Sequence, residues 1–143
     1  MRLRRETETT SAGGGTDRIV YKLTQKVPGH GGEPGLITTM YIDAAEYAVL
    51  TQLPALSLTK TRLTIPPLGV DVFEGCLTGL VIGEAEFADA EAMERFVPPP
   101  GTLAEVTHDH RLTGGSLAAM TGPELALLLA EYGVTKSGRI PPA

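Results

Sequence analysis

The feature that most constrains the fold is a series of short segments that are rich in β-branched and aromatic residues and are bounded by Gly or Pro. We expect seven strands, at residues 2–7, 18–27, 36–42, 55–65, 70–75, 77–87 and 102–108. Their short connections favour antiparallel pairing, and closure of the sheet would remove its exposed edges. The sequence therefore predicts an α+β fold, an antiparallel β-barrel or tunnel of about seven strands with two or three peripheral helices.

Helical spacing of apolar residues appears in three places, at residues 43–53, 88–96 and 121–133. Asp43 with Glu46 predicts a capping box at the first helix, and Thr121 is an expected cap of the last. The last helix carries an apolar stripe that we expect to pack on the outside of the barrel, with a dimer contact as the alternative; it consists of Leu125, Leu128, Leu129 and Tyr132.

A chain of 143 residues is long enough for one domain with its own core. We therefore expect residues 1–143 to form a single domain. Within it, residues 1–113 supply the tunnel sheet and the short helices, and residues 121–133 supply the C-terminal helix.

Charge and cysteine content exclude several classes of protein. A net charge of −5 argues against nonspecific nucleic-acid binding as the main task. No apolar run reaches the roughly 18 residues of a membrane span. Cys76 is the single cysteine, so an internal disulfide is excluded and a cytoplasmic location is expected.

Like charges recur at a spacing of two residues, which places them on one face of a strand. Lys60 with Arg62 and Glu84 with Glu86 are the clearest pairs, and the same spacing relates Arg2 to Arg4. A single pair of this kind is most simply a solvated outer face. The recurrence instead favours a charged interior, which would also include Lys22, Lys26, Asp71 and Glu105.

Such an interior has a chemical purpose. Lys and Arg can grip the oxygens of a triphosphate, and two confined carboxylates favour a hard cation such as Mg²⁺ or Mn²⁺ between them. The pair His108 and His110 could hold a metal, but His-x-His is common in loops, and we interpret these two as loop residues.

Four stretches resemble the CYTH superfamily, the triphosphate tunnel metalloenzymes, which include adenylate cyclases of class IV and thiamine triphosphatases. They are "KTR", "VDVFEG", "GLVIGEAEF" and "FVPPPGTLAEVTHDHR". The resemblance implies an antiparallel tunnel that uses Mg²⁺ or Mn²⁺. It implies phosphate binding by Arg2, Arg4, Lys26, Lys60 and Arg62, metal binding by Glu84 and Glu86, and a tunnel lining that includes Lys22, Asp71 and Glu105. It assigns no catalytic residue.

The chain also departs from the CYTH pattern, because the N-terminal strand E-x-E-x-K is not found before Arg2. The carboxylates in "ETET" follow the arginines, and we interpret them as a solvated hairpin end. Either the natural start lies further upstream or the strand has been lost. In the second case we expect an open seam in the sheet, which a second copy could fill to make a homodimer.

Two functions remain open from the sequence. The first is a triphosphate- or polyphosphate-binding tunnel protein, with a metal-dependent hydrolase activity that is impaired or lost. Its ligands would be inorganic triphosphate, polyphosphate, or a nucleoside or thiamine triphosphate, and neither nucleic acid nor a membrane is expected as partner. The alternative is a non-enzymatic anion-binding or protein-interaction module derived from the same fold.

Overall fold

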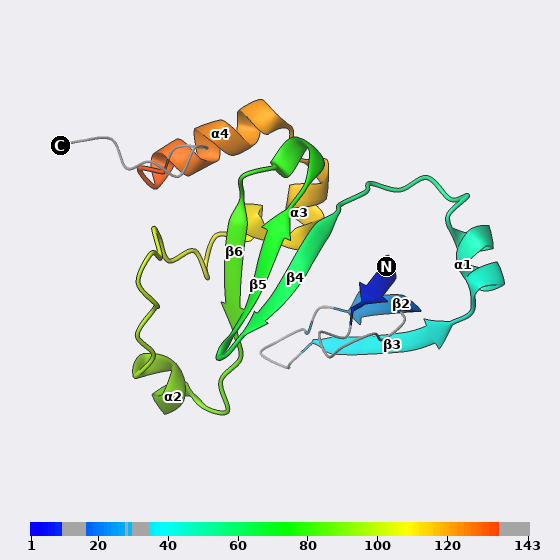
Figure 1. Cartoon of the computed structure of the whole chain (residues 1–143), viewed down its shortest axis with the longest axis horizontal. Helices are drawn as coiled ribbons and strands as arrows, with labels where there is room; N and C mark the ends of the chain where they lie inside the picture. The colour runs from blue at the N-terminus through cyan, green and yellow to red at the C-terminus, as the bar shows by residue number, and fades with distance from the viewer. Residues whose placement is uncertain (10–16, 28, 30–34, 135–143) are drawn as a thin grey trace. The chain divides into compact units, whose positions relative to one another are not determined.

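The computed structural model describes residues 1–9, 17–27, 29 and 35–134. The chain divides into two compact units, Met1–Ala55 and Leu56–Ala143, which are treated separately below. Each unit contains one three-stranded antiparallel sheet, as Figure 1 shows. The α+β class and the antiparallel pairing are thereby confirmed, whereas closure into a tunnel and a single domain over residues 1–143 stay predictions.

The first unit has three strands and one helix: β1 (Arg2–Glu8), β2 (Arg18–Val27), β3 (Leu36–Ile42) and α1 (Ala44–Leu50). β2 lies in the centre, with Arg4 opposite Lys22 on one side and Tyr41 opposite Lys22 on the other. This confirms the hairpin expected between the first two strands. The glycine-rich loop expected at residues 12–15 lies outside the described residues.

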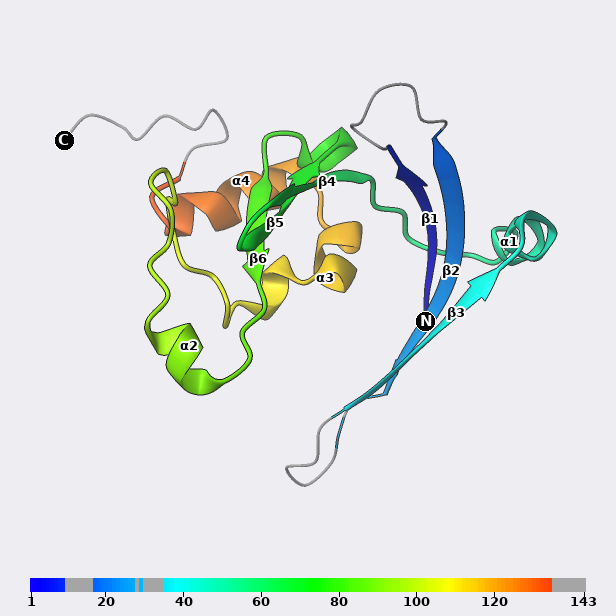
Figure 2. The ribbon, with the colours of Figure 1, turned by 60° about the horizontal axis from the view of Figure 1, so that its bottom comes forward.

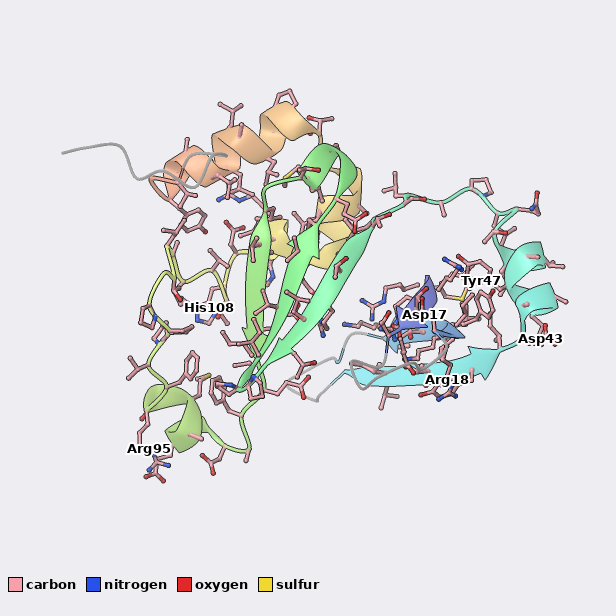
Figure 3. The ribbon with its side chains drawn as sticks, in the orientation of Figure 1. Asp17, Arg18, Asp43, Tyr47, Arg95 and His108 are labelled. Carbon is pink, nitrogen blue, oxygen red and sulfur yellow. The ribbon has the colours of Figure 1, made fainter. Side chains whose placement is uncertain are left out.

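The two faces of the first sheet differ in character because successive side chains alternate across a strand. On one face, Tyr21 of β2 packs against Tyr47 of α1 with ring centroids 4.6 Å apart (Figure 3). Asp43 begins α1, and its side chain accepts hydrogen bonds from the amides of Ala45 and Glu46, which confirms the predicted capping box. The other face is polar and carries Lys22 and the buried Thr24.

The sheet of the second unit contains β4 (Lys60–Ile65), β5 (Leu68–Phe73) and β6 (Val81–Ala85). β4 and β6 are shorter than predicted, whereas β5 keeps the predicted length and begins two residues earlier. The junction expected between the last two of these strands contains a 3₁₀ turn over Gly75–Leu77. Gly75 and Gly79 have φ angles of 64° and 98°, which interrupt an extended backbone where glycine is favoured.

Three helices accompany this sheet: α2 (Ala90–Glu94), α3 (Gly114–Ala119) and α4 (Gly122–Glu131). α3 and α4 lie alongside the sheet in Figures 1 and 2. Thr121 caps α4 as predicted, whereas α3 was not predicted. Each helix in the described part of the chain is too short or too polar to cross a bilayer.

The core of the second unit lies between this sheet and α3 and α4, and it consists of Phe73, Leu77, Leu80, Leu117, Leu125 and Leu129. Phe73 lies two residues after Asp71, so the two side chains share one face of β5. Leu125 and Leu129 of the α4 stripe pack in this core with Phe73. That the stripe lies on the outside of a barrel stays a prediction.

The strand predicted at residues 102–108 does not form, and the described residues contain six strands rather than about seven. Local hydrogen bonds occupy its backbone instead. The carboxylate of Glu105 accepts the amide of Thr107 at 2.8 Å, and the hydroxyl of Thr102 donates to the carbonyl of Pro99 at 2.8 Å. Side chains that bond nearby backbone groups compete with strand pairing in this way.

Candidate functional site

Asp71 lies at the centre of the charged face of the second sheet. β5 places it opposite Arg62 of β4, and Lys60 lies two residues before Arg62 on the same face. The Arg62 guanidinium donates from Nε to Oδ1 of Asp71 at 2.6 Å and from Nη2 to Oδ2 at 2.7 Å. Lys60 also donates to Oδ2. One carboxylate thereby fixes the orientation of two cations.

The electrostatics keep this group ionised at neutral pH. Asp71 is 1% exposed, and burial alone would raise its pKa. The hydrogen bonds from Arg62 and then Lys60 outweigh burial and hold the pKa of Asp71 below its usual range. The hydrogen bond to Asp71 also raises the pKa of Arg62.

A second carboxylate reaches Arg62 from the other side. Glu84 of β6 lies opposite Gly69, and its Oε2 accepts a hydrogen bond from Nη2 of Arg62. The guanidinium extends over Gly69, where an added Cβ would meet its Cζ, Nε and Nη1 atoms at 3.7 Å. We call Lys60, Arg62, Asp71 and Glu84 the Asp71 cluster.

The first sheet carries a comparable group on its polar face, centred on Glu6. Arg4 Nη1 lies 2.9 Å from one carboxylate oxygen of Glu6, and Lys22 Nζ lies 2.5 Å from the other. Lys22 also lies over the ring of Tyr41, 5.6 Å from its centroid. Burial opposes ionisation of Glu6, but the hydrogen bond from Lys22 and the charge of Arg4 outweigh it and lower its pKa. We call Arg4, Glu6 and Lys22 the Glu6 cluster.

Arg2 and Lys26 lie on the same face as the Glu6 cluster, because Arg2 pairs with Thr24 and Lys26 lies two residues after Thr24. The sequence-predicted cations thus gather in two sets. Arg2, Arg4, Lys22 and Lys26 share one face of the first sheet, and Lys60 and Arg62 share one face of the second. That both sets line one tunnel stays a prediction.

The structure places the two carboxylates predicted as metal ligands differently. Glu84 is engaged by Arg62, and Glu86 follows Ala85, the last residue of β6. Within residues 1–9, 17–27, 29 and 35–134, no three His, Cys, Asp or Glu side chains lie so that they could hold a metal ion. Metal binding by Glu84 and Glu86 stays a prediction, because Mg²⁺ can be held by one or two carboxylates together with waters and substrate phosphates.

Glu105, predicted to line the tunnel, lies on an open pocket of about 520 Å³, with His108 in the same loop (Figure 3). The hydrogen bond to Thr107 lowers the pKa of Glu105. The pocket is lined by Glu105, Val106, His108, Asp109, His110, Arg111 and Tyr132. That Glu105 lines a tunnel stays a prediction.

The most tightly held residue of this pocket is Asp109, whose side chain is 10% exposed. It accepts a hydrogen bond from Arg111 Nη2 at 2.8 Å and from the Tyr132 hydroxyl at 2.7 Å. Arg111 also pairs with Glu131 of α4 at 2.9 Å. The hydrogen bonds from Arg111 and then Tyr132 lower the pKa of Asp109. We interpret this group as an anchor of the loop.

The sequence reasoning missed Glu6, which it took for part of a solvated hairpin end. A signal for it exists, because Arg2, Arg4 and Glu6 continue the two-residue alternation along one strand face. The anchoring role of Asp109 had no comparable signal, since its partner Tyr132 is 23 residues away along the chain.

Comparison with known proteins gives two similarities. No family model matches the chain. A stretch of 49 residues is 43% identical to an inorganic triphosphatase of Nitrosomonas europaea, and it covers 34% of this chain and 32% of that protein. The chain thus matches about a third of the length of this curated relative.

The second similarity is to the crystal structure of the hypothetical protein NE1496. The TM-score is 0.52 at 26% sequence identity, over 83% of this chain and 85% of that chain. Together the two similarities support a CYTH-like protein. Membership of the CYTH superfamily stays a prediction.

Proposed function

We propose that this chain binds inorganic triphosphate or a related polyphosphate, and that the basic faces of its two sheets line one CYTH-like tunnel. The observation that carries the proposal is the Asp71 cluster, in which a buried carboxylate orients Lys60 and Arg62 side by side. The partial identity to an inorganic triphosphatase supports the same ligand class.

The geometry suits a phosphate chain for a physical reason. An arginine fork matches the spacing of phosphate oxygens, and a lysine adds a compact charge beside it. Nε and Nη2 of Arg62 are used by Asp71 and Glu84, while its Nη1 has no hydrogen-bond partner within the described residues. Because Asp71 already holds the fork, less side-chain entropy is lost when phosphate binds.

Hydrolysis is the second candidate function, and the likeness to a triphosphatase favours it. The resemblance in the sequence implies Mg²⁺ or Mn²⁺ for that activity, and this requirement stays a prediction. The engagement of Glu84 by Arg62 favours binding without efficient turnover. A phosphate-release assay with either metal separates the two, since an active enzyme turns over at roughly 1–10³ s⁻¹.

Isothermal titration calorimetry with inorganic triphosphate tests the binding proposal directly. A hydrogen bond to a charged group contributes about 1.5–3 kcal/mol, so Lys60→Ala and Arg62→Ala should each weaken binding by roughly one to two orders of magnitude. Arg95→Ala is the matched control, because Arg95 is an exposed cation that follows the last residue of α2. Unchanged affinity in both site variants would rule out this site.

A further inference from the structure

We propose that Glu84 is a displaceable counter-ion that competes with triphosphate for Arg62, whereas Asp71 is a permanent anchor of the same guanidinium. This inference rests on the proposed function and adds a residue that regulates phosphate binding at the same site. It follows from the unequal way in which the two carboxylates hold one arginine.

The two carboxylates differ first in exposure. The side chain of Asp71 is 1% exposed, while that of Glu84 is 57% exposed. They differ also in the number of bonds. Asp71 receives Nε and Nη2 of Arg62 together with Lys60, whereas Glu84 receives Nη2 of Arg62 alone.

These differences decide which carboxylate can leave. If Asp71 lost its partners, it would be a buried charge without compensation, which is costly. Glu84 can turn into water and remain solvated, because an exposed ion pair contributes only about 0–1 kcal/mol. A triphosphate carries several negative charges and can replace the single charge of Glu84 at Nη2.

The position of Glu84 determines what its displacement provides. Glu84 reaches Nη2 from β6, on the edge of the guanidinium that Asp71 does not cover completely. When Glu84 leaves, one N–H of Nη2 and the Nη1 group of Arg62 become available together, while Nε and the other N–H of Nη2 remain on Asp71. Glu84 therefore lowers the affinity of the free protein for phosphate and prevents weaker anions from occupying the site.

This role differs in its effect from that of a metal ligand. If Glu84 acted only through a metal, its removal would weaken binding in the presence of that metal and leave binding unchanged in its absence. As a competitor, its removal strengthens binding when no metal is present. Glu84→Gln keeps the size of the side chain and removes the charge, so it isolates this effect.

The test is calorimetry with inorganic triphosphate in EDTA, on the wild-type chain and on Glu84→Gln. We expect Glu84→Gln to bind about threefold to tenfold more tightly, which is the range set by loss of one exposed pair and one nearby like charge. Higher salt should reduce the difference, because screening weakens the pair in the wild-type chain.

Glu91→Gln is the matched control. Glu91 is also an exposed carboxylate paired with an arginine, Arg95, but it lies on α2. The Glu91→Gln variant should bind triphosphate with the same affinity as the wild-type chain. Equal or weaker binding by Glu84→Gln, or the same gain in Glu91→Gln, would overturn the inference. If no variant and no wild-type chain bound triphosphate, the proposed function itself would fail, and this inference with it.

Discussion

Asp71 and Glu6 each hold two basic side chains, and this arrangement explains how like charges can lie side by side on one face of a sheet. Lys60 and Arg62 share Asp71, and Arg4 and Lys22 share Glu6. In each case the repulsion between two cations is offset by a carboxylate from the same sheet. Each of these two pairs of neighbouring cations is therefore part of a larger charged group that includes a carboxylate.

The first prediction concerns the stability that Asp71 provides. Asp71→Asn removes the charge that Lys60 and Arg62 share, and it should lower the free energy of unfolding by about 1.5–3 kcal/mol, the range for hydrogen bonds to charged groups. Urea unfolding followed by circular dichroism measures this change. Glu86→Gln is the control, because Glu86 forms no ion pair in the described part of the chain. An equal loss in both variants would contradict the assignment.

The second prediction concerns pH. The pKa of Asp71 in the folded chain lies below its usual value, because the hydrogen bonds from Arg62 and Lys60 outweigh burial. Its contribution to stability is therefore complete above the unfolded pKa of roughly 3.9 and is lost as the pH falls through the lower folded value. The stability difference between wild-type and Asp71→Asn chains should narrow in acid below about pH 4. A difference that grew in acid would refute this.

At the residue scale, the sequence predicted the shared faces but not the pairings. The two-residue spacing placed Lys60 and Arg62 together and left Asp71 on one side of its strand. That Asp71 meets Arg62 depends on the register of β4 and β5, in which Arg62 lies opposite Asp71. Register is set by the turn between strands and by packing, and neither is explicit in residue types.

At the element scale, the expectations were wrong at two segments, residues 102–108 and α3, and each has a local physical reason. The segment 102–108 has strand-like composition, but its polar side chains bond the nearby backbone. α3 was missed because Gly114 and Gly115 disfavour a helix. The Thr113 hydroxyl accepts the amide of Ser116 and caps it, and Leu117 packs in the core.

The third prediction tests whether α3 belongs to that core. Leu117 is 1% exposed, so Leu117→Ala should destabilise the chain by about 2–5 kcal/mol, through lost burial and the cavity left behind. Leu127→Ala on α4 is the control, because Leu127 is 71% exposed and should change stability by at most about 0.5 kcal/mol. Thermal unfolding of both variants measures the contrast. Similar midpoints would show that α3 is not packed as described.

At the scale of the whole molecule, the chain has two sets of cations that could bind the proposed ligand, one set in each unit. The fourth prediction is that they serve one site. Calorimetry should give one triphosphate per chain, and Arg4→Ala and Arg62→Ala should each weaken that same binding event. Two ligands per chain, with each variant removing one of them, would show that the units bind independently.

The sequence predicted the order of most elements, the class of fold and the antiparallel pairing, because these follow from local composition and short connections. Sheet closure and a homodimer stay predictions, since they depend on contacts between residues far apart in the chain or in different chains. Light scattering of the purified chain, with and without triphosphate, would measure its oligomeric state.

The Asp109 anchor has a consequence for how α4 is held in the second unit. Arg111 joins Asp109 to Glu131. Along the chain, Asp109 lies 2 residues from Arg111, and Glu131 lies 20 residues from it. The bridge therefore closes a loop around α3 and α4 much as a covalent cross-link would, in a chain whose single cysteine cannot supply one. Unlike a disulfide, this ion-pair bridge is insensitive to reductants, and acid or high salt weakens it. The last turn of α4 should therefore loosen under those conditions, while the β4–β6 sheet keeps its pairing.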